Sequence, residues 1–162
     1  SPTHLAGKPG DGTVFITEGP LKGDLAHALS GRTFGCVPGA NQYANLPPFL
    51  EAMQLMGTKN VYEAYDMDKL LKTICRGDYN EKCVHCENYK KDWRGQAIPC
   101  EKKCVKRQNI QRGCRKLAEI CRELELSAKA LTWDTDEDGD WAEHVKGVDD
   151  YLYGLKQKNN NS

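Results

Sequence analysis

Apolar residues recur at helical spacing over several stretches of the chain. From Phe49 to Met56 they lie three to four positions apart, and Gly57 ends the run. Pro48 suits the first turn of a helix, where the backbone N–H that proline lacks would have no intrahelical acceptor. The pattern predicts a helix from about Pro48 to Met56.

Two longer segments show the same repeat. The first is Asn60–Cys75, in which Asn60 and Glu63 have the spacing of a capping box. The second is Pro99–Leu131, which places four cysteines and several leucines on one helical face. A short helix is also predicted over Val148–Leu155. Together these segments favour a mostly α fold.

The first 35 residues have a different character. They are rich in glycine, are interrupted by Pro2, Pro9 and Pro20, and contain one β-like stretch, Thr13–Thr17. We expect residues 1–35 to form an extended N-terminal arm. Residues 36–135 are predicted to form a small disulfide-stapled helical domain, and residues 136–162 an acidic turn and C-terminal tail.

Charge and hydropathy narrow the possible partners. The 162 residues include 23 Lys and Arg against 23 Asp and Glu, so the formal net charge is zero. A chain without a basic excess is not expected to bind nucleic acid. No apolar stretch approaches the ~18 residues of a membrane span, and no signal peptide is visible. We expect a mature secreted form or an ectodomain fragment.

The eight cysteines indicate a disulfide framework. Seven of them fall within residues 75–121, and such density is typical of an oxidising compartment. The predicted location is therefore secreted or cell-surface. A zinc site is the alternative, since nitrogen and sulfur ligands lie close together at Cys83, His85, Cys86, Cys100 and Cys104. The disulfide interpretation uses all eight cysteines and is preferred.

An integrin-type tripeptide follows directly after Cys75. Arg76, Gly77 and Asp78 would present a guanidinium group and a carboxylate in a loop bounded by cysteines. The same residues are also ordinary turn formers. They therefore indicate either an adhesion motif or a simple turn.

An acidic run near the C-terminus resembles the first half of a calcium loop. Asp134, Asp136 and Asp138 occupy positions 1, 3 and 5, and Gly139 occupies position 6. Position 12 is Val145 rather than the bidentate glutamate. A weak Ca²⁺ site and a solvated acidic turn both fit this pattern.

Catalytic motifs are missing from the sequence. The four histidines are scattered, and there is no GxSxG, HExxH or phosphate-binding loop. If the cysteines are oxidised, no thiolate nucleophile remains. The chain is predicted not to be an enzyme, and no cofactor other than weakly bound calcium is expected.

The cysteine spacing resembles that of Frizzled-type cysteine-rich domains. The resemblance rests on the run Ile98–Cys104 followed by Cys114, on the long interval from Cys36 to Cys75, and on the spacing of Cys75 and Cys83. It covers residues 36–135. The family has ten cysteines, and this chain lacks the first and the last.

The resemblance implies a disulfide pattern and a kind of ligand. Transferred residue by residue, it implies the pairs Cys36–Cys83, Cys75–Cys114 and Cys104–Cys121, and it leaves Cys86 and Cys100 to pair with each other. Members of the family bind lipidated proteins or sterols. Because the cysteine pattern departs from that of the family, the resemblance supports the family's fold for this chain more than the family's ligand-binding surface.

Three functions follow as hypotheses. The first is an extracellular recognition module, either a receptor ectodomain or a secreted binding protein, that engages a protein or a lipid-bearing partner. The second is a secreted adhesion or anti-adhesion protein that presents residues 76–78. The third is a carrier of a small apolar ligand held by Phe49, Met53, Met56 and Leu71.

Overall fold

A five-stranded sheet forms the centre of the computed structural model, which describes residues 3–70, 91–96, 105–133 and 145–161. The strand order is β1-β3-β2-β4-β5. Only β1 runs antiparallel to its neighbour, and β3, β2, β4 and β5 are parallel to one another. The strands are β1 (His4–Ala6), β2 (Thr13–Glu18), β3 (Phe34–Val37), β4 (Asn60–Glu63) and β5 (Ser127–Ala130).

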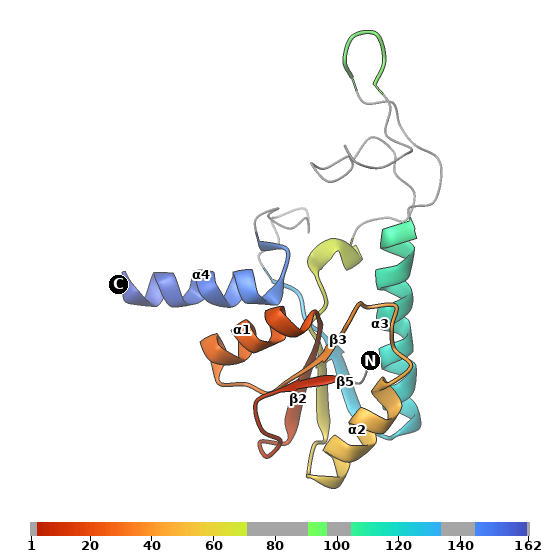
Figure 1. The fold of residues 1–162 in the computed structure, drawn as a ribbon, viewed down its shortest axis with the longest axis vertical. Coiled ribbons are helices and arrows are strands. Elements are labelled where there is room, and N and C mark those ends of the chain that lie inside the picture. The colour runs from red at the N-terminus through yellow and green to blue at the C-terminus, as the bar shows by residue number, and fades with distance from the viewer. Residues whose placement is uncertain (1–2, 71–90, 97–104, 134–144, 162) are drawn as a thin grey trace.

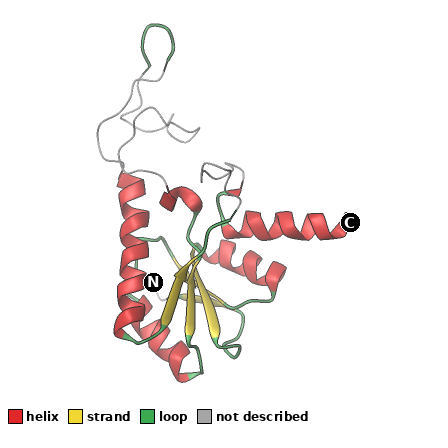
Figure 2. Ribbon diagram, turned by 180° about the vertical axis from the view of Figure 1, so that it is seen from behind, coloured by secondary structure: helices red, strands yellow, loops and turns green. Residues whose placement is uncertain are grey.

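Helices cover both faces of this sheet. On one face lie α1 (Pro20–Ser30) and α4 (Val148–Asn160), and on the other lie α2 (Leu46–Leu55) and α3 (Val105–Glu123), as Figures 1 and 2 show. A short 3₁₀ turn, η1 (Met67–Leu70), follows β4 and packs beside α3. Two helical layers around a mostly parallel sheet define an α/β fold.

The central strand β2 explains why both faces need cover. Val14 and Ile16 point into the core under α2 and α3 and are fully buried. Phe15 points to the opposite face, where its ring stacks on Phe34 and Tyr62 of the two neighbouring strands. Alternate side chains of one strand therefore serve two cores, as expected for a strand covered on both sides.

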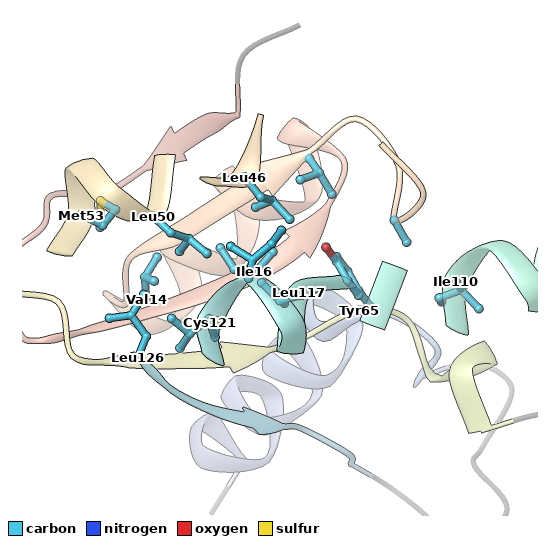
Figure 3. Packing of buried hydrophobic residues seen from close by; sticks show 14 residues of the cluster. Val14, Ile16, Leu46, Leu50, Met53, Tyr65, Ile110, Leu117, Cys121 and Leu126 are labelled. Carbon is cyan, nitrogen blue, oxygen red and sulfur yellow. The ribbon is translucent and has the colours of Figure 1, made fainter. Parts of the chain in front are cut away.

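The larger core lies between the sheet, α2 and α3. In Figure 3, Ile16 lies at its centre, with Leu46 and Leu50 of α2 and Leu117 of α3 around it. Full burial of one such side chain stabilises the fold by about 1.5–3 kcal/mol. At Gly113, α3 comes so close to the chain after β3 that an added Cβ would lie 2.1 Å from the carbonyl oxygen of Ala40.

The predicted fold class, a mostly α domain stapled by disulfides, is wrong. The chain has an α/β fold, and Cys36, Cys114 and Cys121 are free thiols in the part that the structure describes. An extended N-terminal arm is also wrong, because residues 4–37 supply β1, β2, α1 and β3. The boundary expected at residue 36 falls inside β3. The strands other than β2 have only three or four residues, too few to display a period of two clearly.

Two predicted helices differ from the observed elements. The segment beginning at Asn60 forms β4, whose residues Val61 and Tyr62 are β-branched and aromatic. Of the segment predicted from Pro99 to Leu131, α3 covers Val105–Glu123. The backbone then turns at Glu125, which has a φ of 58°, and continues as β5.

Other local predictions are confirmed. The β-like stretch after Gly12 is β2, and α2 has prolines in its first turn as expected. The C-terminal helix also forms, and it extends beyond the predicted end at Leu155 to Asn160. Within the described residues, no helix has the length and apolar character needed to cross a membrane.

Candidate functional site

The carboxyl ends of β2 and β4 meet at the place where the strand order changes direction. From β2 the chain passes through α1 to β3 on one side, and then through α2 to β4 on the other side of β2. In open α/β sheets, ligands bind outside the carboxyl ends of the strands at this switch point. The fold therefore directs attention to the residues that follow β2 and β4.

The end of β2 supplies a glutamate and a lysine. Glu18 is the last residue of the strand, and Gly19 follows it with a φ of 86°, which favours glycine. Pro20 then begins α1, so Lys22 belongs to the first turn of the helix. This tight strand-to-helix turn holds both side chains at the same edge of the sheet.

The end of β4 supplies two aspartates. Asp66 lies three residues after the strand and is 8% exposed, and Asp68 is in η1. Between them, the Met67 N–H donates to the carbonyl oxygen of Lys146 at 2.9 Å. This bond brings residue 146, far along the chain, to the same edge.

The lysines form ion pairs with the aspartates. Lys22 Nζ lies 2.6 Å from Asp66 Oδ1. Lys146 Nζ lies 2.6 Å from Asp68 Oδ2 and 3.8 Å from Asp66 Oδ2. About a fifth of each lysine side chain is exposed, so these ion pairs are partly buried.

Glu18 faces Asp66 directly. Burial raises the pKa of the Glu18 carboxyl, and the Asp66 carboxylate raises it further through repulsion and a side-chain hydrogen bond. Lys22 and the backbone N–H of Ala40, which donates to Glu18 Oε2 at 3.4 Å, act in the opposite direction. Two carboxyl groups in contact favour one bound proton or a cation between them.

Two buried carboxylate oxygens have no hydrogen-bond partner among the described residues. Among the described residues, Asp68 Oδ1 is shielded from solvent and receives no hydrogen bond, and the same holds for Asp149 Oδ1 in the first turn of α4. Burial and the neighbouring Asp150 raise the pKa of Asp149. Buried carboxylate oxygens are normally paired, so both atoms are suited to accept from a ligand.

The residues that follow β2 and β4 line an open cavity of about 680 Å³. Its charged wall consists of Glu18, Lys22, Asp66, Asp68 and Lys146. Its opposite wall comes from the chain after β3 and from α3, and carries three side-chain amides. The lining residues are Glu18, Gly19, Lys22, Pro38, Gly39, Ala40, Asn41, Gln42, Asp66, Asp68, Asn109, Ile110 and Lys146.

The carboxylates surround lysine nitrogens rather than a common empty point. In the described part of the chain, no three His, Cys, Asp or Glu side chains converge in the way that a bound metal requires. Lys22 and Lys146 hold the oxygens of Asp66 and Asp68.

Of the apolar residues predicted to hold a ligand, the three that the structure describes lie in different surroundings. Met53 belongs to the core, and the ring of Phe49 covers Gly35, where an added Cβ would lie 2.5 Å from it. Met56 is 53% exposed. Leu71 lies outside the described residues. Core packing therefore accounts for the helical repeat of this segment.

Several other predicted sites lie outside the described residues. These are the tripeptide Arg76, Gly77 and Asp78, the acidic run with Asp134, Asp136 and Asp138, and the cysteines 75, 83, 86, 100 and 104 together with His85. Each predicted disulfide includes at least one of these cysteines, so the pairing stays a prediction.

Of the described cysteines, Cys36 and Cys121 are buried and Cys114 is partly buried, and the pKa of each thiol is raised. Burial raises the pKa of Cys121 to about 11, and burial together with the Asp24 carboxylate raises that of Cys36 to about 12. The pKa of Cys114 is also raised, first by burial and then by the nearby Glu63. These thiols are poor nucleophiles at neutral pH.

Sequence reasoning missed the residues that form the cavity. Glu18 directly follows the one stretch that was predicted to be β-like, and two aspartates alternate at positions 66 and 68 shortly after Val61 and Tyr62. Interpreting residues 60–63 as a strand would have placed acidic residues after two strands. That pattern is the signal for a site at a sheet edge.

Fold and site together define an α/β protein with a carboxylate-lysine cavity at the carboxyl edge of its sheet. No family model, curated protein or solved structure matches the chain. The Frizzled-type resemblance therefore stays a prediction based on cysteine spacing, and the helical fold that it implied is contradicted by the sheet.

Proposed function

We propose that the cavity binds a divalent cation together with a phosphate group, and that the protein is a Mg²⁺-dependent enzyme acting on phosphate esters. The observation that carries the proposal is the meeting of Glu18, Asp66 and Asp68 with Lys22 and Lys146 at the switch point of the sheet. Acidic and basic groups in one open cavity provide ligands for both a cation and an anion.

The acidic side chains support cation binding. Mg²⁺ prefers oxygen ligands and is commonly held by one or two carboxylates together with substrate phosphate oxygens. Asp66 and Asp68 lie at the same edge of the cavity, and Asp68 Oδ1 is buried without a partner among the described residues. A divalent cation at these two aspartates would satisfy the buried oxygen and leave Glu18 available for proton transfer.

The lysines support phosphate binding. An ammonium group is a common phosphate ligand, and both lysines remain accessible from the cavity. A volume of about 680 Å³ falls within the range of roughly 300–1,000 Å³ that is usual for small-molecule sites. A cation at Asp66 and Asp68 would free the lysines to contact a phosphate group beside it.

Glu18 is the best candidate for proton transfer. Its pKa is raised by burial and by Asp66, which brings a carboxyl group closer to the range useful for general acid catalysis. In ester hydrolysis, a water oxygen would bond to phosphorus and the ester P–O bond would break. The departing oxygen would take the Glu18 proton, and the attacking water would return a proton to the carboxylate. A bound Mg²⁺ would stabilise the charge on the phosphoryl oxygens.

Titration with Mn²⁺ tests cation binding directly. Mn²⁺ replaces Mg²⁺ at oxygen sites and can be followed by electron paramagnetic resonance. We expect binding by the wild-type chain, and an affinity at least ten-fold lower in Asp66→Asn and Asp68→Asn. Glu119→Gln is the matched control, because its exposed carboxylate on α3 pairs with Lys116 and does not line the cavity. No binding by the wild-type chain at millimolar Mn²⁺ would overturn the proposal.

Hydrolysis of p-nitrophenyl phosphate and bis-p-nitrophenyl phosphate tests the chemistry. We expect Mg²⁺-dependent release of p-nitrophenol from at least one of them, lost in Glu18→Gln and retained in Glu119→Gln. These assays also decide between this proposal and the sequence-based prediction that the chain is not an enzyme. An extracellular recognition module stays a separate prediction, because the tripeptide at residues 76–78 and most of the cysteines lie outside the described residues.

A further inference from the structure

Another ion pair lies outside the cavity lining, and its lysine is more deeply buried than those of the cavity. Lys69 Nζ pairs with Glu63 Oε2, and the two side chains are only 6% and 10% exposed. Lys69 also donates to the carbonyl oxygen of Leu131, just beyond β5. Its ammonium group lies 5.4 Å from the centre of the Trp133 ring. The buried charge is therefore surrounded by a carboxylate, a carbonyl and an aromatic face.

This pair connects the two ends of the segment that carries the cavity aspartates. Glu63 is the last residue of β4 and Lys69 is in η1, so Asp66 and Asp68 lie between them. The Lys69 N–H donates to the Asp66 carbonyl oxygen at 3.2 Å. The Gln111 side chain of α3 donates to the Lys69 carbonyl oxygen at 3.4 Å. The ion pair thus closes the loop at its base, and α3 contacts the loop backbone at Lys69, one of the two members of the pair.

Trp133 extends the same network to the lysine of the cavity. Its indole N–H donates to the carbonyl oxygen of Val145 at 2.6 Å. The next carbonyl, that of Lys146, accepts the Met67 N–H at 2.9 Å. One buried ring therefore contacts Lys69 on one side and fixes the backbone before Lys146 on the other.

We propose that Lys69 is a positioning residue for the cavity: its buried pairing with Glu63 sets the placement of Asp66 and Asp68, and Trp133 carries the same constraint to Lys146. The inference rests on the proposed function of the cavity. Replacement of a buried ion pair by neutral groups is often nearly neutral in stability, whereas the geometry that the pair imposes is lost with it. A variant that replaces both members of the pair can therefore test the positioning role without a large loss of stability.

The double variant Glu63→Gln/Lys69→Met meets this requirement. The glutamine oxygen can still accept the Tyr65 N–H, which Glu63 Oε2 accepts at 3.0 Å, and no charge is left unpaired in the interior. The matched control is Lys116→Met/Glu119→Gln, which removes an exposed pair on α3. Trp133→Phe is the second test variant, since it keeps a ring beside Lys69 and removes the hydrogen bond to Val145.

Two measurements are made on the 162-residue chain. The first is Mn²⁺ affinity, which we expect to fall at least ten-fold in Glu63→Gln/Lys69→Met and to stay unchanged in the control, with similar melting temperatures in both. The second is hydrogen exchange of the Met67 amide by nuclear magnetic resonance, which we expect to become at least ten-fold faster in the double variant and in Trp133→Phe.

The outcomes distinguish this inference from the proposed function. If the wild-type chain binds no Mn²⁺, the proposed function fails, and the exchange of the Met67 amide alone decides whether Lys69 positions the segment. If the wild-type chain binds Mn²⁺ and the folded double variant binds it equally well, the positioning role is overturned. Unchanged exchange at Met67 in both test variants would overturn it as well.

Discussion

Two groups of charges meet around the segment that follows β4, and they differ in how completely their members are paired. Glu63 and Lys69 are almost wholly buried, and Lys69 also donates to a backbone carbonyl. In the cavity, by contrast, Glu18 has a raised pKa beside Asp66, and Asp68 keeps a buried oxygen without a partner among the described residues. A satisfied pair holds a structure in place, whereas an incompletely satisfied group is ready for a ligand.

The largest effect is expected from breaking the satisfied pair. Lys69→Met leaves the Glu63 carboxylate buried without its counter-charge, and such changes cost about 3–5 kcal/mol. Lys22→Met in the cavity should cost less, because the Lys22 side chain is 23% exposed against 6% for Lys69, and because Lys146 Nζ stays 3.8 Å from Asp66 Oδ2 as a counter-charge. Chemical denaturation of both variants measures the difference. Equal losses of stability would show that the two groups are not distinct.

A smaller loss is expected where α3 meets the wall of the cavity. A Cβ at Gly113 would lie 2.1 Å from the Ala40 carbonyl oxygen, so Gly113→Ala must push α3 away from this wall, at a cost of roughly 1–3 kcal/mol. Gly154→Ala in α4 is the matched control, since no atom lies within 4 Å of its added methyl group. That change should stabilise by about 0.5–1 kcal/mol. Thermal melting of the two variants checks both signs.

The pH dependence of stability should reveal the raised pKa of Glu18. A carboxyl group whose pKa is raised in the folded state favours folding below its unfolded pKa, and this advantage is lost as pH rises through the folded pKa. Glu18→Gln should therefore raise the melting temperature at pH 7 relative to wild type, with a smaller difference at pH 4. Calorimetry at the two pH values measures this. A lower melting temperature of the variant at pH 7 would contradict the assignment.

The smallest effect is expected from the exposed pair on α3. Lys116 Nζ and Glu119 Oε2 lie 3.3 Å apart, and more than two fifths of each side chain is exposed. Such a pair contributes about 0.3–0.5 kcal/mol. A double-mutant cycle with Lys116→Met and Glu119→Gln should return a coupling energy of that size. A coupling above about 1 kcal/mol would remove these variants as controls.

Local signals in the sequence were sufficient for several elements. Prolines at the start of α2 and Gly57 after it mark that helix, and the run beginning at Thr13 marks β2. The β4 segment was misassigned because Val61, Ala64 and Tyr65 also fit helical spacing, and a four-residue strand is too short to contradict it. The number of cysteines then favoured a disulfide framework over a sheet.

The candidate site could not be predicted because it depends on pairing between distant strands. Glu18 and Asp66 meet only when β2 lies parallel beside β4, and neither neighbourhood carries a recognised motif by itself. Lys146 joins them through a backbone hydrogen bond to Met67. Strand order depends on the whole chain, and no local pattern in the sequence indicates which strands pair.

The hydrogen bond between Met67 and Lys146 also bears on how the chain folds. It joins segments on either side of α3 and β5, so the last wall of the cavity can close only after most of the chain has been synthesised. Contacts between such distant segments form slowly, because a long loop must be closed before they contribute. Phosphate or cation binding during refolding should therefore appear in the slowest phase, after the sheet has formed, and would act as a probe of the final docking step.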